Sequence, residues 1–429
     1  MHQQHPTRYP FLLESAARNP RIGRFDVLMA FPQEDLSGAS ALSALSDVST
    51  SSTVIPKQFQ HLPFLGGWFV FLPYEFAQEV EPSLRGKVPL ADLAPRMVRC
   101  PAAIVRDHVE ECIWLVSERG QEDIQHLDHD LRQSLDVAMP GSDPSQTTNR
   151  LNEAPGQTYC DQVERILDYI RAGDVFQVNL SRAWSAELPQ KQSPAELYRH
   201  LRSANPAPFS ALAVFEDLSI LSSSPERLVE VRDGWIQTRP IAGTRPRSAD
   251  QAADERLAQE LLAHRKEQAE HVMLIDLERN DLGRVAVPGT VEVDEHMVLE
   301  SYAHVHHIVS NVRAQLREGL SALDVIHAVF PGGTITGCPK VRCMEIIGEL
   351  EQEPRGVYTG SLGYLDCRGH LDLNILIRTL ELRGNELRFR TGAGIVADST
   401  PEAELAETRA KAKGLLRALG IENPDNGSL

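Results

Sequence analysis

Short strand-like runs and longer helical segments alternate along this 429-residue chain without a regular strand–helix–strand rhythm. In residues 290–296 (TVEVDEH) and 386–390 (ELRFR) apolar and polar residues alternate, which is typical of half-buried antiparallel strands. Further strand-like runs occupy residues 218–224 and 228–241. No GxGxxG motif follows a first strand. The pattern therefore predicts an α+β fold with largely antiparallel sheets.

Helical segments lie between these runs. Apolar residues recur at helical spacing over residues 163–170, and Gly173 stands where a C-cap is expected. Residues 264–277 are rich in helix formers, and Thr400-Pro401 supplies an N-cap and a first residue for a helix over residues 401–419.

Two polar stretches are predicted to be loops. Residues 34–53 are rich in Ser, Ala and Thr, and residues 138–157 are rich in Pro, Gly, Ser and Asn. We expect the second to be a linker between an N-terminal region (residues 1–137) and a larger region (residues 158–429).

The net charge of -17 argues against a nucleic-acid or anionic-membrane partner. An acidic protein can still bind an acidic ligand through a local cation, a metal or backbone N–H groups. The six cysteines form no CxxC pair, and neither a signal peptide nor an apolar run of membrane-spanning length is evident. We therefore expect a cytoplasmic protein with reduced thiols.

Two pairs of glutamates have the spacing of one helix face. Glu267 precedes Glu270 by three residues, and Glu404 precedes Glu407 by three. Carboxylates from two such helices could converge on a hard cation such as Mg²⁺. Spacing alone favours the alternative, a solvated surface on which Glu407 pairs with Lys411.

Other polar and glycine-rich segments have two interpretations each. Residues 331–340 (PGGTITGCPK) and 391–396 (TGAGIV) can cradle a carboxylate or form ordinary turns. Arg378, flanked by Ile and Thr-Leu, indicates carboxylate recognition or a structural ion pair. His306 and His307 would point to opposite faces of a strand, so at most one faces a site.

In their order, these segments resemble the chorismate-utilising synthases, which include component I of anthranilate synthase and of aminodeoxychorismate synthase. Isochorismate and salicylate synthases are more distant relatives. The resemblance spans residues 159 to 418 and is carried by DVFQVNLSR, NPAPFSA, SPERL, TRPIAGTRPR, KEQAEHVMLIDLERNDLGRV, HVHHIVS, FPGGTITGCPKVRCMEIIGELE, GSLGY, IRTL, GAGIVADS and EAELAETRAKA. It implies two packed, mainly antiparallel sheets with outer helices, an α/β/β/α arrangement in which both regions form one intertwined unit.

The resemblance also implies a site. Glu270 and Glu407 match the magnesium ligands, supported by Glu267 and Glu404, and Mg²⁺ would hold the ring carboxylate of chorismate. Glu226 matches the general acid that protonates the departing hydroxyl, and His307 and Thr334 match residues beside the ring. Further substrate contacts are implied at Gly243, Thr244, Tyr358, Arg378, Gly392, Ala393, Gly394 and Lys411.

The blocks NPAPFSA, FPGGTITG and GSLGY favour aminodeoxychorismate synthase component I over anthranilate synthase component I. Ala242 argues the other way, because aminodeoxychorismate synthases typically have a nucleophilic lysine there and anthranilate synthases an alanine. We hypothesise that ammonia or water beside Ala242 adds at C2 instead. A chorismate-binding regulatory protein without catalysis is a third alternative.

Two partners follow from the resemblance. Ammonia is expected from a separate glutamine amidotransferase subunit in a heterodimer. Tryptophan is a candidate ligand for a pocket formed by Glu14, Ser15, Pro208 and Phe209, although residues 11–15 (FLLES) could equally be a core strand.

Overall fold

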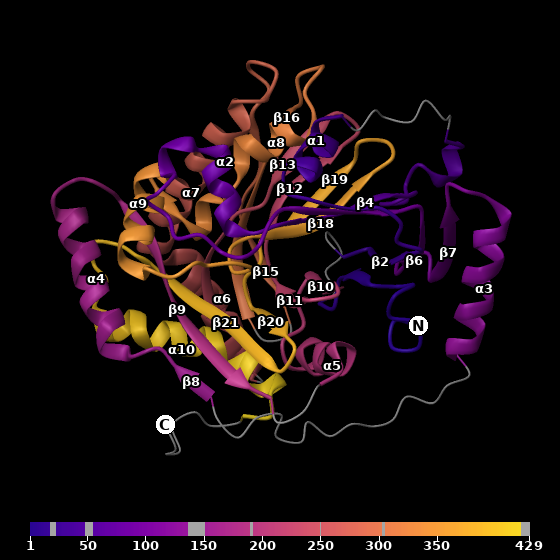
Figure 1. Ribbon diagram of the computed structural model, residues 1–429. Helices are drawn as coiled ribbons and strands as arrows, with labels where there is room; N and C mark the ends of the chain where they lie inside the picture. The colour runs from indigo at the N-terminus through magenta and orange to yellow at the C-terminus, as the bar shows by residue number, and fades with distance from the viewer. Residues whose placement is uncertain are drawn as a thin grey trace.

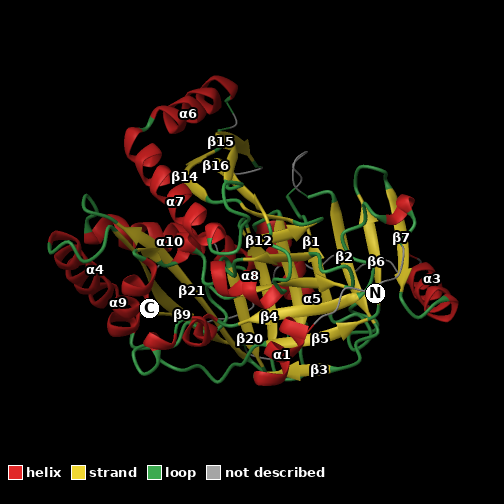
Figure 2. Ribbon diagram, turned by 90° about the horizontal axis from the view of Figure 1, so that it is seen from above, coloured by secondary structure: helices red, strands yellow, loops and turns green. Residues whose placement is uncertain are grey.

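The structure is a computed structural model that describes residues 1–17, 23–47, 55–135, 151–188, 192–248, 250–302 and 305–421. Two antiparallel sheets lie against each other, with helices on their outer faces (Figure 1), as the sequence and the resemblance predict. Figure 2 shows the strands of the two sheets side by side in the centre of the molecule, with α4, α9 and α10 at one end and α3 at the other.

The larger sheet has 11 strands in the described part of the chain. In spatial order they are β17 (Gly337–Cys338), β9 (Gln177–Glu187), β21 (Glu386–Ile395), β20 (Thr379–Arg383), β11 (Ser219–Ser224), β10 (Phe209–Val214), β1 (Phe11–Glu14), β2 (Phe25–Ala30), β6 (Ala102–Asp107) and β7 (Cys112–Ser117), while β8 (Leu151–Glu153) pairs with β9. Strands from before and after residues 138–157 therefore share this sheet.

The second sheet has 10 strands within the same described ranges. Their order is β14 (Ile241–Pro246), β16 (Val305–Gln315), β13 (Trp235–Thr238), β12 (Arg227–Arg232), β19 (Leu371–Asn374), β18 (Ser361–Asp366), β4 (Gly67–Leu72), β5 (Arg96–Cys100) and β3 (Asp35–Ser37), with β15 (Glu292–Ser301) paired to β16. This sheet also combines both regions of the chain.

The helices are α1 (Ala39–Asp47), α2 (Ala77–Val80), α3 (Gln121–Leu135), α4 (Gly156–Arg171), α5 (Pro194–Ala204), α6 (Gln251–Ala263), α7 (Arg265–Gly283), α8 (Ala322–Val329), α9 (Lys340–Glu351) and α10 (Pro401–Ala418). Short 3-10 turns are η1 (Lys57–Phe59), η2 (Tyr74–Phe76), η3 (Pro82–Leu84) and η4 (Gly333–Ile335). The predicted helices are confirmed as α4, α7 and α10. Among the described residues, no helix combines the length and apolar character needed to span a membrane.

Alternation along the strands explains the layers. In β4, Phe69 and Phe71 enter the core between the sheets, whereas Val70 and Leu72 face the core under α1, α7 and α8. In β10, Leu212 packs under α5 and α10 while its neighbours join the core between the sheets. Strands covered on both faces are apolar throughout rather than alternating.

The prediction of a loop over residues 34–53 is wrong in part. Asp35–Ser37 form β3 and Ala39–Asp47 form α1, because Ala41 and Leu45, one helical turn apart, are buried in the core. Residues 48–53, and residues 138–150 of the predicted linker, lie outside the described residues. The end of that linker is ordered, since it includes β8 and the start of α4 at Gly156.

Candidate active site

Glu226 is a buried acid between β11 and β12. Its carboxylate accepts a 2.6 Å hydrogen bond from Thr334 Oγ1 on η4 and another from the Ile241 backbone. Burial raises the pKa of Glu226 to about 8, against which the Thr334 hydrogen bond acts. At neutral pH this carboxyl group is largely protonated, as a general acid must be before the leaving group departs.

His307 on β16 is a neutral imidazole. Its Nδ1 lies 2.9 Å from Thr244 Oγ1 on the neighbouring strand β14, and the Gly243 backbone also hydrogen-bonds the ring. Burial lowers the pKa of His307 to about 4, and the positive charge of Arg378 acts in the same direction. Ala242, buried two residues before Thr244, presents only a methyl group.

The two adjacent histidines have different partners, as the strand geometry predicts. His306 contacts Ser301 Oγ at 2.7 Å and the Asp254 carboxylate of α6 at 3.1 Å. It is therefore a satisfied structural histidine, and only His307 belongs to the candidate site.

Arg378 carries a half-buried guanidinium between β19 and β20. Its backbone has a φ of 54°, in the left-handed region that a non-glycine residue seldom adopts. Within the described residues, no acceptor lies within hydrogen-bond distance of the guanidinium, and burial lowers the pKa of Arg378. The groups whose ionised forms would raise the pKa of Arg378 again are Tyr358, Glu407 and Glu226. An Arg in this situation is suited to bind an anionic ligand.

The glycines of β21 let two polar side chains lie against the strand. A Cβ on Gly392 would come within 2.7 Å of Tyr358 Oη, and one on Gly394 would collide with Gln177 Nε2. The side chain of Ala393, between them, is buried in the core on the opposite face. Tyr358 is thereby held beside Gly392, where it and the strand backbone can receive a carboxylate.

Each of the two predicted metal ligands is linked to β21 through one other side chain. Glu270 accepts a 2.7 Å hydrogen bond from Gln177, which covers Gly394. Glu407 pairs with Lys411 at 2.7 Å, and Lys411 also donates to Gly392 O at 2.9 Å. Glu270 and Glu407 are therefore linked, through Gln177 and Lys411, to two residues of β21 that lie about 7 Å apart along the strand. The predicted alternative, an ion pair between Glu407 and Lys411, is also present.

This donor set fits Mg²⁺. The ion prefers oxygen ligands and is usually bound by one or two carboxylates together with waters and substrate, and ligating carboxylates are themselves hydrogen-bonded, as Glu270 and Glu407 are. Beside Glu270, Gln177 Oε1 is buried without a hydrogen-bond donor, so it could accept from a metal-bound water. Across the described residues, however, no group of three or more His, Cys, Asp or Glu side chains could hold a metal by itself.

The two predicted supporting carboxylates have other contacts. Glu267 lies 2.9 Å from the position of a Cβ on Gly243 and pairs with Arg245 at 3.3 Å. It is thus directed towards β14. Glu404, half-buried on α10, acts electrostatically on Tyr159, whose pKa is raised mainly by burial.

Sequence reasoning assigned no role to Gln177, Asn179 or Glu278. The first two lie on one face of β9, while Val178 and Leu180 point into the core on the other. Asn179 donates weakly to Thr334 O at 3.4 Å, and its Oδ1 is buried without a donor. The alternation in QVNLS could have identified this polar face. Glu278 stands on α7 among charged residues, and only its burial distinguishes it.

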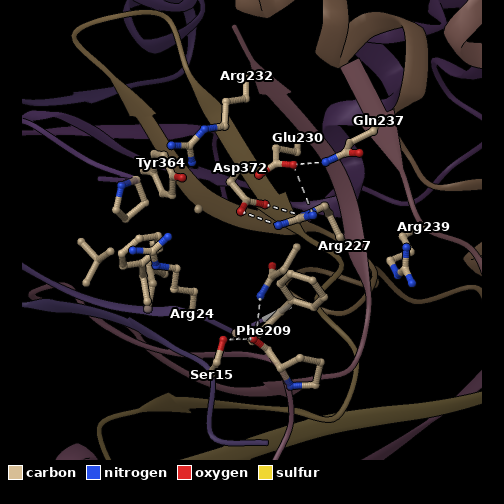
Figure 3. A pocket seen from close by; sticks show the side chains of 18 of the residues that line it. Ser15, Arg24, Phe209, Arg227, Glu230, Arg232, Gln237, Arg239, Tyr364 and Asp372 are labelled. Carbon is tan, nitrogen blue, oxygen red and sulfur yellow. Dashed lines mark hydrogen bonds and ion pairs between the residues drawn. The ribbon is translucent and has the colours of Figure 1, made fainter. Parts of the chain in front are cut away.

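A second candidate site is a cavity of about 440 Å³ between the sheets (Figure 3). All four residues predicted to form a tryptophan pocket line it: Glu14, Ser15, Pro208 and Phe209. Ser15 Oγ donates to Pro208 O at 2.8 Å, while the Glu14 carboxylate accepts from Tyr198 at 2.7 Å and pairs with Arg202 at 2.9 Å.

The opposite wall of this cavity carries a half-buried ion pair. Arg227 makes two 2.9 Å hydrogen bonds to Asp372 and a longer one, 3.4 Å, to Glu230, which Figure 3 shows beside the labelled Gln237. The guanidinium also lies over the Phe209 ring, 5.0 Å from its centroid. The cavity is therefore polar on one side and aromatic at its edge.

Comparison with known proteins identifies relatives over most of the chain. Residues 9–417 match the family of chorismate binding enzymes. The chain is 43% identical over 408 residues (94% of this chain, 82% of the relative) to an anthranilate synthase component I-like protein of Synechocystis. It is 42% identical over 374 residues (84% and 78%) to aminodeoxychorismate synthase component 1 of Bacillus subtilis.

A solved structure agrees with the fold. Anthranilate synthase component I from Streptococcus pneumoniae superimposes with a TM-score of 0.79 at 33% identity, covering 92% of both chains. The relatives thus carry the names of two different reactions. What they share is chorismate, and the chain belongs to the chorismate binding enzyme family.

Proposed function

We propose that the chain is component I of an aminodeoxychorismate synthase, which replaces the C4 hydroxyl of chorismate with an amino group from ammonia. The observation that carries the amination of chorismate is Glu226, a buried acid with a raised pKa that accepts a hydrogen bond from Thr334 and interacts with the charge of Arg378. Hydroxide is a poor leaving group, so its departure requires a proton from such an acid. Water then leaves, and Glu226 is left as the carboxylate.

The substrate has two carboxylates, and the site offers two places for them. Arg378, Tyr358 and the backbone at residues 392–394 would bind the enolpyruvyl carboxylate. Glu270 and Glu407 would hold Mg²⁺, which supplies positive charge for the ring carboxylate. When Glu407 binds the metal, Lys411 would contact solvent or substrate in place of Glu407. It would keep its hydrogen bond to Gly392 O.

Aminodeoxychorismate formation is supported by the blocks NPAPFSA, FPGGTITG and GSLGY and by the relative from B. subtilis. Ala242 cannot be a nucleophile, so we propose that ammonia or water adds at C2 as the C4 hydroxyl leaves. Ammonia then attacks C4, and the group at C2 departs, either as neutral ammonia from an ammonio group or as water once the C2 hydroxyl has regained the proton lost when it formed. The chain's own part is to orient the ring and deliver the proton.

A second candidate reaction is that of anthranilate synthase, which yields anthranilate and pyruvate. Two observations favour it: Ala242 itself, and the neutral His307 beside it, which is able to accept a ring proton. The relative from S. pneumoniae bears that name, and the relative from Synechocystis is named as anthranilate synthase component I-like.

Product identification separates these reactions. The purified chain is incubated with chorismate, Mg²⁺ and ammonium, and products are detected by mass and fluorescence. We expect aminodeoxychorismate, which gives 4-aminobenzoate only after a separate lyase is added. Anthranilate and pyruvate formed by the chain alone would contradict the proposal. Unconsumed chorismate would indicate a regulatory protein.

We also propose that a separate glutamine amidotransferase delivers the ammonia. Cys343 is buried and donates to Gln177 O at 3.0 Å, so it is not placed as a glutaminase nucleophile. The chain alone should therefore use ammonium but not glutamine, and adding an amidotransferase subunit should confer glutamine dependence. Activity of the isolated chain with glutamine would refute this.

Tryptophan is our proposed ligand for the cavity between the sheets. Its size, the polar wall around Arg227 and the edge formed by Pro208 and Phe209 support a zwitterion with an aromatic side chain. Calorimetry with tryptophan tests binding, and kinetics with and without it test regulation. Absence of heat at millimolar tryptophan would count against this ligand.

A further inference from the structure

Glu278 is a second buried acid beside Glu226, and the reaction outlined above does not use it. It lies on α7, two helical turns beyond Glu270, and is 5% exposed. Its carboxylate lies close to the Thr238 hydroxyl at the end of β13 and to the Gly333 backbone N–H, and both favour its ionised form. A side chain in this position links α7, β13 and η4.

The turn η4 connects the two acids. Gly333 lies against the Glu278 carboxylate, and the next residue, Thr334, donates its hydroxyl to Glu226 at 2.6 Å. Glu278 Oε1 lies 3.2 Å from the position that a Cβ on Gly333 would take, so the approach is close and a side chain there would crowd it. Because the two residues are adjacent in one short turn, a shift at Gly333 would displace Thr334 from Glu226.

Charge couples the two acids as well. The negative charge of Glu278 adds to burial in raising the pKa of Glu226, and Lys411 opposes it. Burial raises the pKa of Glu278, and the neighbouring Asp281 acts in the same direction. Asp281 in turn pairs with Lys340. The positive charge of Arg378 also interacts with Glu226 and favours its ionised form. Among these groups, Glu278 is the one whose removal would make ionisation of Glu226 easier.

We propose that Glu278 is a positioning residue for the general acid: it fixes η4 so that Thr334 contacts Glu226. The charge of its carboxylate also favours the protonated form of Glu226. The proposal rests on the role of Glu226 as the acid in the proposed function. It does not depend on which amino product is formed.

The test compares three variants of the full chain. Glu278→Gln keeps an oxygen for the Gly333 N–H but removes the charge, so the alkaline limb of the pH profile of chorismate consumption should move down by on the order of one pH unit. Its KM for chorismate should change little. Glu278→Ala also releases the turn, and its kcat should fall at least about tenfold.

Asp130→Asn is the matched control, because Asp130 is a buried carboxylate on α3 that contacts Tyr9 and Arg8, far from η4. It should lower the melting temperature without moving the alkaline limb. A limb unchanged in Glu278→Gln, or moved equally in Asp130→Asn, would overturn the proposal.

A measurement without turnover separates this proposal from the proposed function. The infrared carbonyl band of protonated carboxyl groups is followed against pH in the wild type, Glu226→Gln and Glu278→Gln. The band component lost in Glu226→Gln should titrate at lower pH in Glu278→Gln than in the wild type. Were the wild type inactive with chorismate, the proposed function would fail, while this titration would still decide whether Glu278 favours the protonated form of Glu226. An unshifted titration would refute that effect of Glu278.

Discussion

The candidate active site and the cavity between the sheets each contain an arginine, and the two arginines differ in how their charge is balanced. Arg227 in the cavity is bound by Asp372 through two hydrogen bonds. The carboxylates of Asp372 and Glu230 raise the pKa of Arg227 against the effect of burial. In the candidate active site, Arg378 has no such acceptor among the described residues, and burial lowers its pKa.

This difference indicates separate roles. A buried guanidinium with a bidentate carboxylate partner is already satisfied, so it mainly supports the fold and shapes the cavity wall. A guanidinium without a partner is costly to bury and gains most when an anion arrives. Gln177 and Asn179, beside β21, also have buried oxygens that lack donors. The active-site region therefore keeps hydrogen-bonding capacity for a ligand.

The largest expected effect belongs to the general acid. Glu226→Gln keeps the shape of the side chain and can still accept from Thr334, but it cannot deliver a proton. The rate of chorismate consumption should fall about 10²–10⁴-fold, with the melting temperature maintained. Steady-state kinetics and calorimetric melting measure both quantities, and a rate within about threefold of the wild type would remove Glu226 from the chemistry.

A pair of Arg→Met variants tests the comparison directly. Arg378→Met should lower kcat/KM for chorismate about 10²–10³-fold without loss of stability, because a half-buried charge without a hydrogen-bond acceptor is removed. Arg227→Met leaves Asp372 uncompensated, so it should lower the free energy of unfolding by about 3 kcal/mol while folded enzyme retains its turnover. The opposite pattern, with Arg378→Met destabilised and active, would make Arg378 the structural one.

The pH dependence of turnover sharpens the assignment of Glu226. Its pKa is about 8 in the folded chain and ordinarily 4.5, and the protonated form is the active one, so turnover should decline as pH rises through about 8. The same shift means that its contribution to stability is present below pH 4.5 and lost as pH rises towards 8. Glu226→Gln should flatten that part of the stability curve, and an unaltered curve would contradict the raised pKa.

The smallest effect is expected at Ala242. If addition of ammonia or water at C2 replaces a lysine adduct, Ala242→Lys should retain aminodeoxychorismate formation within about fivefold, because either nucleophile serves. Product analysis by mass measures this. If the wild type formed anthranilate and Ala242→Lys formed aminodeoxychorismate, residue 242 would determine the reaction.

The fold class could be predicted because period-two alternation and helix caps are local properties. Thr400-Pro401 begins α10, and Gly173, with a φ of 83°, follows α4 as expected. The helix α1 was missed because its small residues resemble a loop, and only its packing against the core makes it a helix. The order of strands depends on long-range pairing, for example β1 between β2 and β10, which spacing does not reveal.

Some residues of the candidate site were predicted from the sequence, whereas others, and the contacts between them, were not. The resemblance supplied Glu226 and Thr334, but their contact across 108 positions of sequence is a property of the fold. Glu278 was not predicted, since a glutamate in a charged helix segment is ordinarily solvated and its burial depends on η4 and β13. Gln177 and Asn179 lay within a recognised block, yet their shared face was not used.

The central claim is that one site formed by Glu226, Arg378, Glu270 and Glu407 binds chorismate. A crystal structure of the Glu226→Gln variant with chorismate and Mg²⁺ tests it most directly. We predict a carboxylate of the ligand on the Arg378 guanidinium, the metal between Glu270 and Glu407, and the C4 hydroxyl facing residue 226. Chorismate bound instead beside Arg227 between the sheets, with Arg378 uncontacted, would contradict the account.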